Sequence, residues 1–414
     1  MRKAGPRAVV LLLFLSFGST GWTLPAPPPE SNSSVVAIGD VHGDFDHFVG
    51  ILQRTGLIDK QNHWAGGKNT LVQTGDLLDR GPKPREVMDL LMVLEKESSK
   101  AGGRVVSLLG NHEVMNIMGD LRYVTPENYA SFADGKSDDR RRAAYKEYLK
   151  WRDGHAPIIA ELRQPMELTE GEWMARHPLG YLEQRESFGL HGTYGKWLRT
   201  HAGLTELNGV VFLHGGISPD VSSMKLRDLN ARIQEEISAF DSLKQYMADQ
   251  HLILPFFNLQ EMAAVAEAAL SAAKKSKVRS DPELESRISQ FLHFPQWLCV
   301  RPDGPLWFRG YDQWSDEEGD AQVAKILEAF HANHIVVGHT VQKGGAVRVR
   351  FGGKVFLIDT GMLSSVYVGG RASALDIQNS AKFTAEYMEQ QEVLLEPQKV
   401  SSSNTATEQL TAVQ

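Results

Sequence analysis

The chain repeats one short pattern, in which an apolar run of a few residues ends in a turn built from glycine and a polar residue. The six runs are Val35–Ile38, Thr70–Thr74, Arg104–Leu109, Val210–Leu213, Ile335–Val337 and Val355–Ile358. Short, nearly continuous runs of β-branched residues and leucine are typical of strands buried on both faces. The segments between the first three runs, 45–55 and 85–97, have the apolar spacing of helices. Strands that alternate with helices predict an α/β fold.

Two long stretches interrupt this pattern, at about residues 121–205 and 226–295. The first includes the helix-like segment 138–151, and the second includes the alanine-rich segment 261–275, whose composition favours a helix. We interpret both stretches as helical inserts around the mouth of a site. The tail at 397–414 is rich in Ser, Thr and Gln without periodicity, which predicts disorder.

The glycine turns carry the polar side chains that a metal site needs. In α/β sheets, ligands collect outside the carboxyl ends of the strands, where these turns fall. The candidate ligands are Asp40, His42, Asp76, Asn111, His214 and His339. Imidazole, carboxylate and amide ligands suit manganese, iron or zinc ions. Without cysteine, this set fits such a site better than it fits a structural zinc site built from thiolates. Any one of these turns could be a simple turn, but the whole set predicts two divalent ions about 3.5–4 Å apart.

The order of the motifs is that of a known family. Gly-Asp-x-His-Gly at 39–43, Gly-Asp-x-x-Asp-Arg-Gly at 75–81, Gly-Asn-His-Glu at 110–113, His-Gly-Gly at 214–216 and Gly-His at 338–339 are similar to the phosphoprotein phosphatases among calcineurin-like metallophosphoesterases. The stretches 119–124, 212–219 and 304–311 resemble the Shewanella-like protein phosphatases. The resemblance implies a β-sandwich core flanked by helices, with helical inserts, in one catalytic domain at about 35–390.

The resemblance also implies a role for each motif residue. Asp40, His42 and Asp76 would hold one metal ion, and Asp76, Asn111, His214 and His339 would hold the other. A hydroxide that bridges the two ions would attack phosphorus directly. His112 would protonate the leaving oxygen, with Asp79 orienting its imidazole. Arg80 would bind the phosphate oxygens in a bidentate manner, and Arg309 is expected to be a second substrate-binding arginine.

The substrate is less defined than the metal core. The Ser/Thr branches of the family carry a Ser-Ala-Pro-Asn-Tyr loop near the end of the domain, and the corresponding stretch, 356–362, lacks that tyrosine. The missing tyrosine argues against the Ser/Thr preference. The Shewanella-like phosphatases, which the chain resembles, are associated with phosphotyrosine, so the resemblance implies a phosphorylated protein as substrate, with phosphotyrosine preferred. A dinucleoside-polyphosphate hydrolase or another small-molecule phosphoesterase is the alternative, because the metal core positions a phosphate rather than a whole substrate. A catalytically silent binding protein is disfavoured, since each expected metal and acid position is filled.

The N-terminus predicts export. Basic residues at 2, 3 and 7 precede an apolar run at 9–17 and then small residues, the order of a secretory signal peptide. The apolar run is about half as long as a membrane-spanning helix, so we expect cleavage after about residue 24 and no stable membrane span afterwards. Residues 25–34 are expected to form a flexible linker. A periplasmic or secreted protein is the resulting expectation.

Charge and cysteine content limit the remaining possibilities. The net charge of −7, from 44 basic and 51 acidic residues, requires no basic face, so we expect no nucleic-acid partner. Cys299 is the only cysteine and excludes an intramolecular disulfide. We interpret it as a small core residue. The oligomeric state is left open by the sequence.

Overall fold

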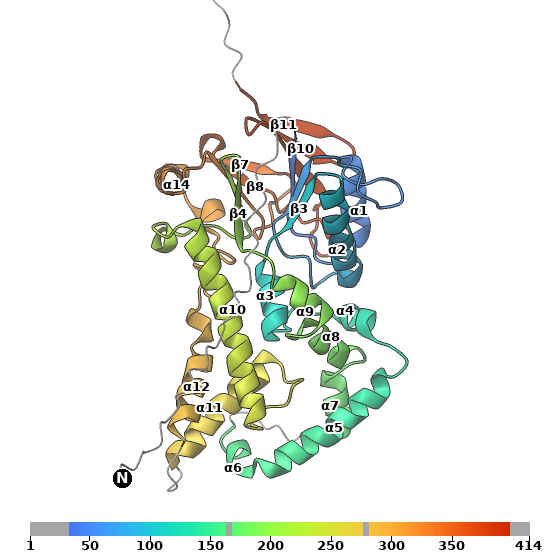
Figure 1. Ribbon diagram of the computed structural model, residues 1–414, viewed down its shortest axis with the longest axis vertical. Coiled ribbons are helices and arrows are strands. Elements are labelled where there is room, and N and C mark those ends of the chain that lie inside the picture. Colours follow the sequence, from blue (N-terminus) through green and yellow to red (C-terminus); the bar gives the residue numbers. More distant parts are fainter. Residues whose placement is uncertain (1–32, 163–167, 276–280, 398–414) are drawn as a thin grey trace, which may run out of the picture.

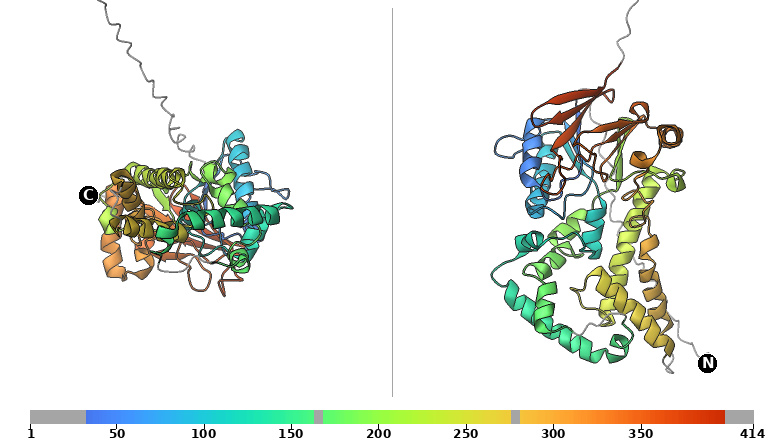
Figure 2. Two further views of the ribbon diagram at one scale, coloured as in Figure 1. Left: turned by 90° about the horizontal axis from the view of Figure 1, so that it is seen from below. Right: turned by 180° about the vertical axis from the view of Figure 1, so that it is seen from behind.

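The computed structural model describes residues 33–162, 168–275 and 281–397. The predicted signal peptide, most of the predicted linker and nearly all of the predicted tail lie outside these residues. The described chain forms two lobes (Figures 1 and 2). One is rich in β-strands and contains residues 33 and 397, the first and last that are described, and the other is elongated and made of helices.

The first sheet of the β-rich lobe has six strands in the order β11-β10-β9-β1-β2-β3. Strands β1 (Val35–Ile38), β2 (Thr70–Gln73) and β3 (Arg104–Ser107) are parallel, so their carboxyl ends lie at one edge. The register pairs Val35 with Thr70 and Thr70 with Arg104. Strands β9 (Ser373–Gln378), β10 (Lys382–Tyr387) and β11 (Gln391–Leu395) extend the sheet in antiparallel fashion beyond β1.

The second sheet has five strands in the order β4-β5-β6-β8-β7. Strands β5 (Val210–Leu213), β6 (His334–Val337) and β8 (Val355–Leu357) are parallel and correspond to the last three runs predicted from the sequence. Strands β4 (Leu204–Leu207) and β7 (Arg348–Arg350) pair in antiparallel fashion at the two edges.

The two sheets enclose an apolar core. Side chains of β1 and β2 such as Ala37 and Val72 belong to one buried cluster with Phe212 of β5 and Phe356 of β8. Phe356 also stacks on Phe383 of β10, with ring centroids 4.3 Å apart. Because successive side chains of a strand point to opposite faces, the other faces of the sheets are free to pack against helices. The prediction of an α/β fold with a β-sandwich core flanked by helices is confirmed.

Helices cover the outer faces of both sheets. Helices α1 (Phe45–Arg54) and α2 (Pro84–Lys100) pack on the first sheet, where Phe48 and Leu91 join the cluster that contains Ile38. The Asp44 side chain caps α1 by accepting a hydrogen bond from the His47 backbone, and Pro84 opens α2. Helix α14 (Asp316–Phe330) lies on the second sheet.

The second lobe holds most of the residues of both predicted inserts; the end of the first, from Leu204, belongs to β4. Its helices are α3 (Asn111–Met118), α4 (Pro126–Phe132), α5 (Ser137–Gly154), α6 (Ala156–Ile159), α7 (Glu170–Arg176), α8 (Tyr181–Phe188), α9 (Thr193–Leu198), α10 (Leu226–Asp249), α11 (Leu259–Lys275) and α12 (Pro282–Leu292). Helix α13 (Gly310–Gln313) and short 3₁₀ turns at Pro219–Val221, Phe294–Gln296 and Phe351–Gly353 complete the helical elements. Helix α3 follows β3 directly and so connects the sandwich to the helical lobe (Figure 1).

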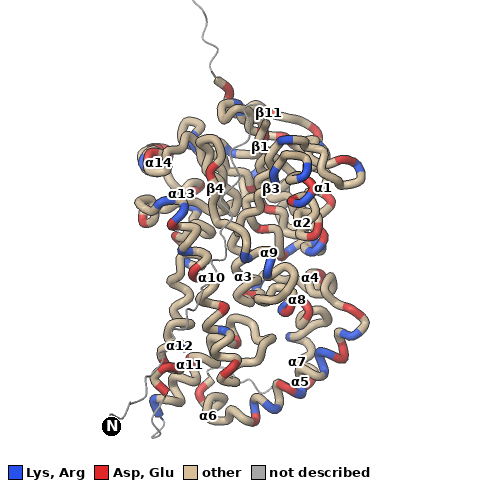
Figure 3. The backbone as a smooth tube through the Cα atoms, viewed as in Figure 1, with Lys and Arg blue, Asp and Glu red and all other residues tan. Residues whose placement is uncertain are grey.

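Charges are distributed over both lobes without a face of one sign in this view (Figure 3). Along α5, for example, basic and acidic residues alternate, and Arg140, Arg141 and Arg142 pair with nearby carboxylates. Among the described residues, no helix combines the length and the apolar character that crossing a membrane requires.

Candidate metal centre

The polar turns that follow β1, β2, β3, β5 and β6 meet at one edge of the sandwich, beside the start of α3. The backbone N–H groups of Val41 and His42 both donate to the carbonyl oxygen of Asp76 at 3.0 Å. The backbone N–H of His339 donates to Asp40 Oδ1 at 2.9 Å, which joins the two sheets. The six predicted ligands are therefore brought together, and all of them are buried.

Several residues of these turns have the left-handed backbone conformation, which is unfavourable for residues other than glycine. His42, Asp76, Asp79, Arg80 and His339 have φ angles of 48°, 60°, 66°, 64° and 66°. A left-handed conformation costs a residue with a side chain about 1–3 kcal/mol, and it persists only where the surroundings determine it. Such strain clusters at functional sites, and here it falls on residues that the sequence motifs had already singled out.

Three of the histidines each place one ring nitrogen against a backbone carbonyl oxygen. The ring nitrogen Nδ1 of His42 lies 2.8 Å from the carbonyl oxygen of Leu78, and Nδ1 of His214 lies 3.0 Å from that of Thr74. Nε2 of His339 lies 3.0 Å from the carbonyl oxygen of Trp307. A carbonyl can only accept, so each neutral ring must donate that N–H and turn its other nitrogen inward with a lone pair. This arrangement is typical of metal-binding histidines.

The inward atoms converge on Asp76. His214 Nε2 lies 3.2 Å from Asp76 Oδ2, 2.9 Å from Asn111 Oδ1 and 3.1 Å from His339 Nδ1. His42 Nε2 lies 3.7 Å from the same Asp76 oxygen. Asp76 thereby belongs to two groups whose ligand atoms lie within 4.8 Å of one another, His42 with Asp76 and His112, and Asp76 with His214 and His339. The atoms around His214 Nε2 carry lone pairs and share no proton, so they repel one another, and this donor set fits cations.

The carboxylates of the centre are also crowded. Burial, and then the nearby carboxylates of Asp359 and Asp76, hold the pKa of Asp40 well above its usual range. Burial also acts on Asp76, but His214, His112 and His42 act against it and hold the pKa of that carboxyl well below its usual range. Buried carboxylates this close together need positive charge to remain ionised. Divalent ions would supply that charge.

A second constellation lies beside the ligands. His112 Nδ1 is 2.6 Å from Asp79 Oδ2, and the amide of Asn116 donates to Asp79 Oδ1 at 3.0 Å. Burial lowers the pKa of His112, but the carboxylates of Asp76 and Asp79 outweigh it, so the net shift of that pKa is upward. The predicted acid and its orienting carboxylate are thus in contact. His112 Nε2 is also 3.8 Å from Asp76 Oδ2, so distance alone would allow it to reach a metal ion.

Two tyrosines lie near the predicted phosphate-binding arginine. Arg80 donates from Nη1 to Nε2 of His42, and its guanidinium carbon lies 5.0 Å and 5.7 Å from the ring centroids of Tyr123 and Tyr367. Tyr123 also lies 5.1 Å from the His112 ring, centroid to centroid. Sequence reasoning included Tyr123 in the stretch 119–124 without giving it a role, and it missed Tyr367. The stretch that lacks the tyrosine of the Ser/Thr branches is followed five residues later by Tyr367, which reaches the site without matching any motif.

Arg309 lies at the edge of the centre. It is exposed, and its Nη1 donates to the carbonyl oxygen of His339 at 2.9 Å and to Thr340 Oγ1 at 3.1 Å. Its predicted contact with substrate stays a prediction.

Two further carboxylates support the turns. Glu113, at the end of the Gly-Asn-His-Glu motif, accepts from the backbone N–H groups of Asp76, Leu77 and Gly110 at 2.7–2.8 Å, which fixes the β2 turn to the start of α3. Burial, and then the charge of Asp76, raise the pKa of Glu113 to about 7. Asp359, after β8, faces Asp40, and burial raises its pKa to about 6. The motif pointed to Glu113 but gave it no role.

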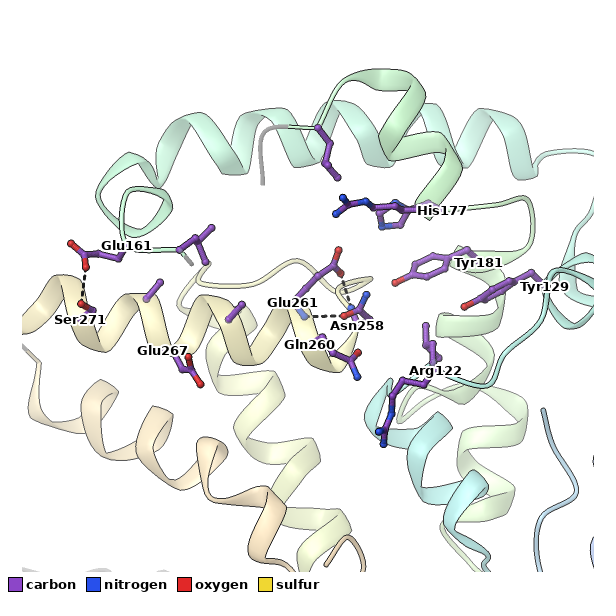
Figure 4. A pocket seen from close by; sticks show the side chains of 16 residues that line it. Arg122, Tyr129, Glu161, His177, Tyr181, Asn258, Gln260, Glu261, Glu267 and Ser271 are labelled. Carbon is purple, nitrogen blue, oxygen red and sulfur yellow. Dashed lines mark hydrogen bonds between the residues drawn. The ribbon is translucent and has the colours of Figure 1, made fainter. Parts of the chain in front are cut away.

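Other reactive side chains lie elsewhere. Cys299 is buried in the core, and burial raises the pKa of its thiol. His155 packs on Trp151 in the helical lobe. His177 lines a cavity of about 760 Å³ that lies between α11 and the helices α4, α7 and α8 (Figure 4). Arg122, Tyr181 and Glu261 also line it. None of the six candidate ligands lines that cavity.

Comparisons with known proteins agree with the fold and the site. The family model of the calcineurin-like phosphoesterases matches residues 33–343. An uncharacterised protein of Schizosaccharomyces pombe is 28% identical over 85% of this chain and 80% of its own length. Shewanella-like protein phosphatase 1 of Plasmodium berghei is 23% identical over 80% of this chain and 67% of its own. The crystal structure of a cold-active protein-tyrosine phosphatase of a psychrophilic Shewanella species is similar with a TM-score of 0.55 and 26% identity, over 88% of this chain and 80% of that one.

The fold and the clustered ligands define a metallophosphoesterase, a hydrolase of phosphoesters. The chain belongs to the calcineurin-like phosphoesterase family, and Shewanella-like protein phosphatases are among its relatives.

Proposed function

We propose that this chain is an exported, metal-dependent phosphoprotein phosphatase that prefers phosphotyrosine. The observation that carries the proposal is the convergence of lone-pair atoms on Asp76, beside the His112–Asp79 pair and the Arg80 guanidinium, which contacts His42. Phosphate-ester hydrolysis needs cations, an acid for the leaving oxygen and a group that binds the phosphate, and each has a candidate here.

The chain's own residues have separate tasks in this proposal. Asp40, His42 and Asp76 would hold one ion, and Asp76, Asn111, His214 and His339 the other, with manganese, iron or zinc suited to these ligands. When bound, the ions would activate a water molecule for direct attack on phosphorus and neutralise charge on the phosphate. Arg80 would fix two phosphate oxygens. His112, kept protonated and oriented by Asp79, would donate its proton to the departing oxygen.

The preference for phosphotyrosine is supported by the surroundings of Arg80. A phosphate bound there would place its ester group between Tyr123 and Tyr367, whose rings favour an aromatic neighbour. Val366 and Val368, on the same loop as Tyr367, are 49% and 99% exposed and add apolar surface. One of the similar solved structures is named a protein-tyrosine phosphatase. A serine ester would leave these groups without an aromatic partner.

A panel of substrates tests this proposal. With manganese present, we expect the highest kcat/KM on a phosphotyrosine peptide, a lower value on the matched phosphoserine peptide, and the lowest on diadenosine tetraphosphate. Tyr367→Leu is expected to reduce the phosphotyrosine value by up to about tenfold, because a ring contact contributes about 0.5–1.5 kcal/mol. The phosphoserine value should change little.

Tyr246→Leu, which alters a tyrosine on α10 outside the site, is the matched control and should leave both values unchanged. A higher kcat/KM on diadenosine tetraphosphate than on either peptide would instead support the alternative, a dinucleoside-polyphosphate hydrolase. Equal values on both peptides would contradict the preference for phosphotyrosine.

Export is proposed from the sequence of the first residues. The basic start, the short apolar run at 9–17 and the small residues after it support a cleaved signal peptide and a periplasmic or secreted protein. We expect the protein recovered from its native cells to begin between Thr20 and Ala26, as measured by intact mass. An intact Met1 in that material would contradict the proposal.

A further inference from the structure

The helical lobe contacts the predicted acid pair through one buried glutamine. Gln184 lies on α8, is 1% exposed, and donates from Nε2 to Asn116 Oδ1 at 2.6 Å. Asn116 lies on α3 and donates from Nδ2 to Asp79 Oδ1 and to the carbonyl oxygen of His112, both at 3.0 Å. Asp79 in turn holds His112 at 2.6 Å. An unbroken series of hydrogen bonds thus runs from the insert to the imidazole.

The chemistry of these groups permits only one arrangement. An ionised carboxylate only accepts hydrogen bonds, so Asn116 must turn its NH₂ group toward Asp79. The Asn116 oxygen then faces Gln184, which must donate a hydrogen bond from its own NH₂ group. If Gln184 were replaced by an apolar residue, the Asn116 oxygen would lose its buried donor, and the amide would be free to rotate away from Asp79.

One observation indicates that this contact is more than packing. The Gln184 Oε1 atom is buried, and within the described part of the chain it has no hydrogen-bond partner, which costs about 1–3 kcal/mol in a protein interior. An apolar side chain at this position would avoid that cost, so the amide is tolerated at the expense of stability. Unpaired buried groups of this kind are uncommon and call for an explanation.

The next residue, Arg185, connects α8 to α3 by a hydrogen bond. Arg185 is buried and donates from Nη1 to the carbonyl oxygen of Asn116 at 3.0 Å. Gly119 ends α3 with a φ angle of +83°, and a Cβ atom there would lie 2.6 Å from Arg185 Nη2. The missing side chain therefore leaves the space that Arg185 occupies. Gln184 and Arg185 together fix both the amide and the backbone of Asn116.

We propose that Gln184 is a positioning residue for the leaving-group proton transfer, acting through Asn116 on the Asp79–His112 pair. The inference rests on the proposed function, because it assumes that His112 is the acid. It assigns to the helical insert a part in the chemistry, in addition to any part in binding substrate. The insert would hold the imidazole in the orientation that delivers its proton.

Leaving-group dependence tests the proposal, since an acid matters most where the departing oxygen is basic. For Gln184→Leu with manganese present, we expect kcat/KM to fall about tenfold on phenyl phosphate and less than about twofold on p-nitrophenyl phosphate. KM should change little on either ester. The ratio of the two values does not depend on how much of the sample is folded, so it remains informative if the variant is less stable. Glu186→Leu, an exposed position on the same helix, is the matched control and should keep the wild-type ratio.

A double-variant comparison separates positioning from general loosening of the lobe. If Gln184 acts through Asn116, then Gln184→Leu combined with Asn116→Leu should lose no more on phenyl phosphate than Asn116→Leu alone. Additive losses, or an equal fall on both esters for Gln184→Leu, would overturn the proposal. A wild-type ratio in Gln184→Leu would overturn it as well.

Failure of the proposed function would look different. In that case the wild-type protein with manganese would hydrolyse neither ester, or His112→Asn would leave the ratio unchanged. The wild-type protein and His112→Asn are therefore measured beside the Gln184 variants.

Discussion

Removal of divalent ions with a chelator is expected to abolish hydrolysis of p-nitrophenyl phosphate, and added manganese is expected to restore it. The loss should be about 10³-fold or more, because metal ions contribute several kcal/mol to such reactions and each 1.4 kcal/mol is a factor of ten. The physical reason lies in the atoms around Asp76. His214 turns a lone pair toward that carboxylate, and Asn111 and His339 turn theirs toward the same nitrogen of His214. These groups can perform no ester hydrolysis by themselves.

Two readouts besides activity accompany this experiment. Ions that bind the folded chain and not the unfolded one raise its stability, so the Tm of the stripped protein should rise as manganese is added. Metal content tests which residues hold both ions and which hold one, because Asp76 belongs to both candidate ligand groups and His339 belongs to only one of them. Asp76→Asn should therefore retain less metal than His339→Asn. Full activity after complete removal of metal would contradict the two-metal proposal.

The clustering of the candidate ligands could be predicted from sequence because their placement follows from local rules. A buried strand that ends in glycine and a polar residue places that side chain at the carboxyl edge of a parallel sheet. Strands β1, β2 and β3 are neighbours, so Asp40, Asp76 and Asn111 had to lie near one another. His214 and His339 come from the second sheet. Their strand-end turns made them candidates for the same centre, and the family resemblance assigned both to one of the two ions.

The antiparallel part of the first sheet was missed although a signal exists. Along β10, polar residues alternate with the apolar residues Phe383, Ala385 and Tyr387, and the turn between β9 and β10 contains Asn379 and Ser380 with φ angles of 52° and 54°. Alternation around such a turn is typical of a hairpin. The search for continuous apolar runs favoured strands buried on both faces, and so it passed over strands with one partly exposed face.

Other features could not have been predicted because they depend on contacts between distant segments. Tyr367 reaches Arg80 from a loop with no motif, and Gln184 reaches Asn116 across 68 positions of sequence. Nothing in the local sequence of α8 indicates which of its polar residues is buried. Asp359 was visible as a strand-end residue, but its closeness to Asp40 follows from how the two sheets pack.

His112→Asn is expected to reduce kcat/KM on phenyl phosphate by about 10²–10³-fold and on p-nitrophenyl phosphate by about tenfold or less. General acid catalysis contributes about 10²–10⁴-fold where the leaving oxygen is basic, and p-nitrophenolate leaves with little help. His112 suits the task because Asp79 holds its Nδ1 at 2.6 Å, and the carboxylates of Asp76 and Asp79 shift its pKa upward against the effect of burial. Asp79→Asn should show the same selectivity to a smaller degree.

The same variant decides between two roles that distance alone leaves open for His112. Its Nε2 lies 3.8 Å from Asp76 Oδ2, so a metal ion could in principle be its partner instead of a leaving group. If His112 were a ligand, His112→Asn would lose metal, and both esters would slow by the same factor. If it is the acid, metal content stays at the wild-type level while the ratio of the two esters changes. His177→Asn, which alters a buried histidine of the helical lobe outside the centre, is the control and should change neither quantity.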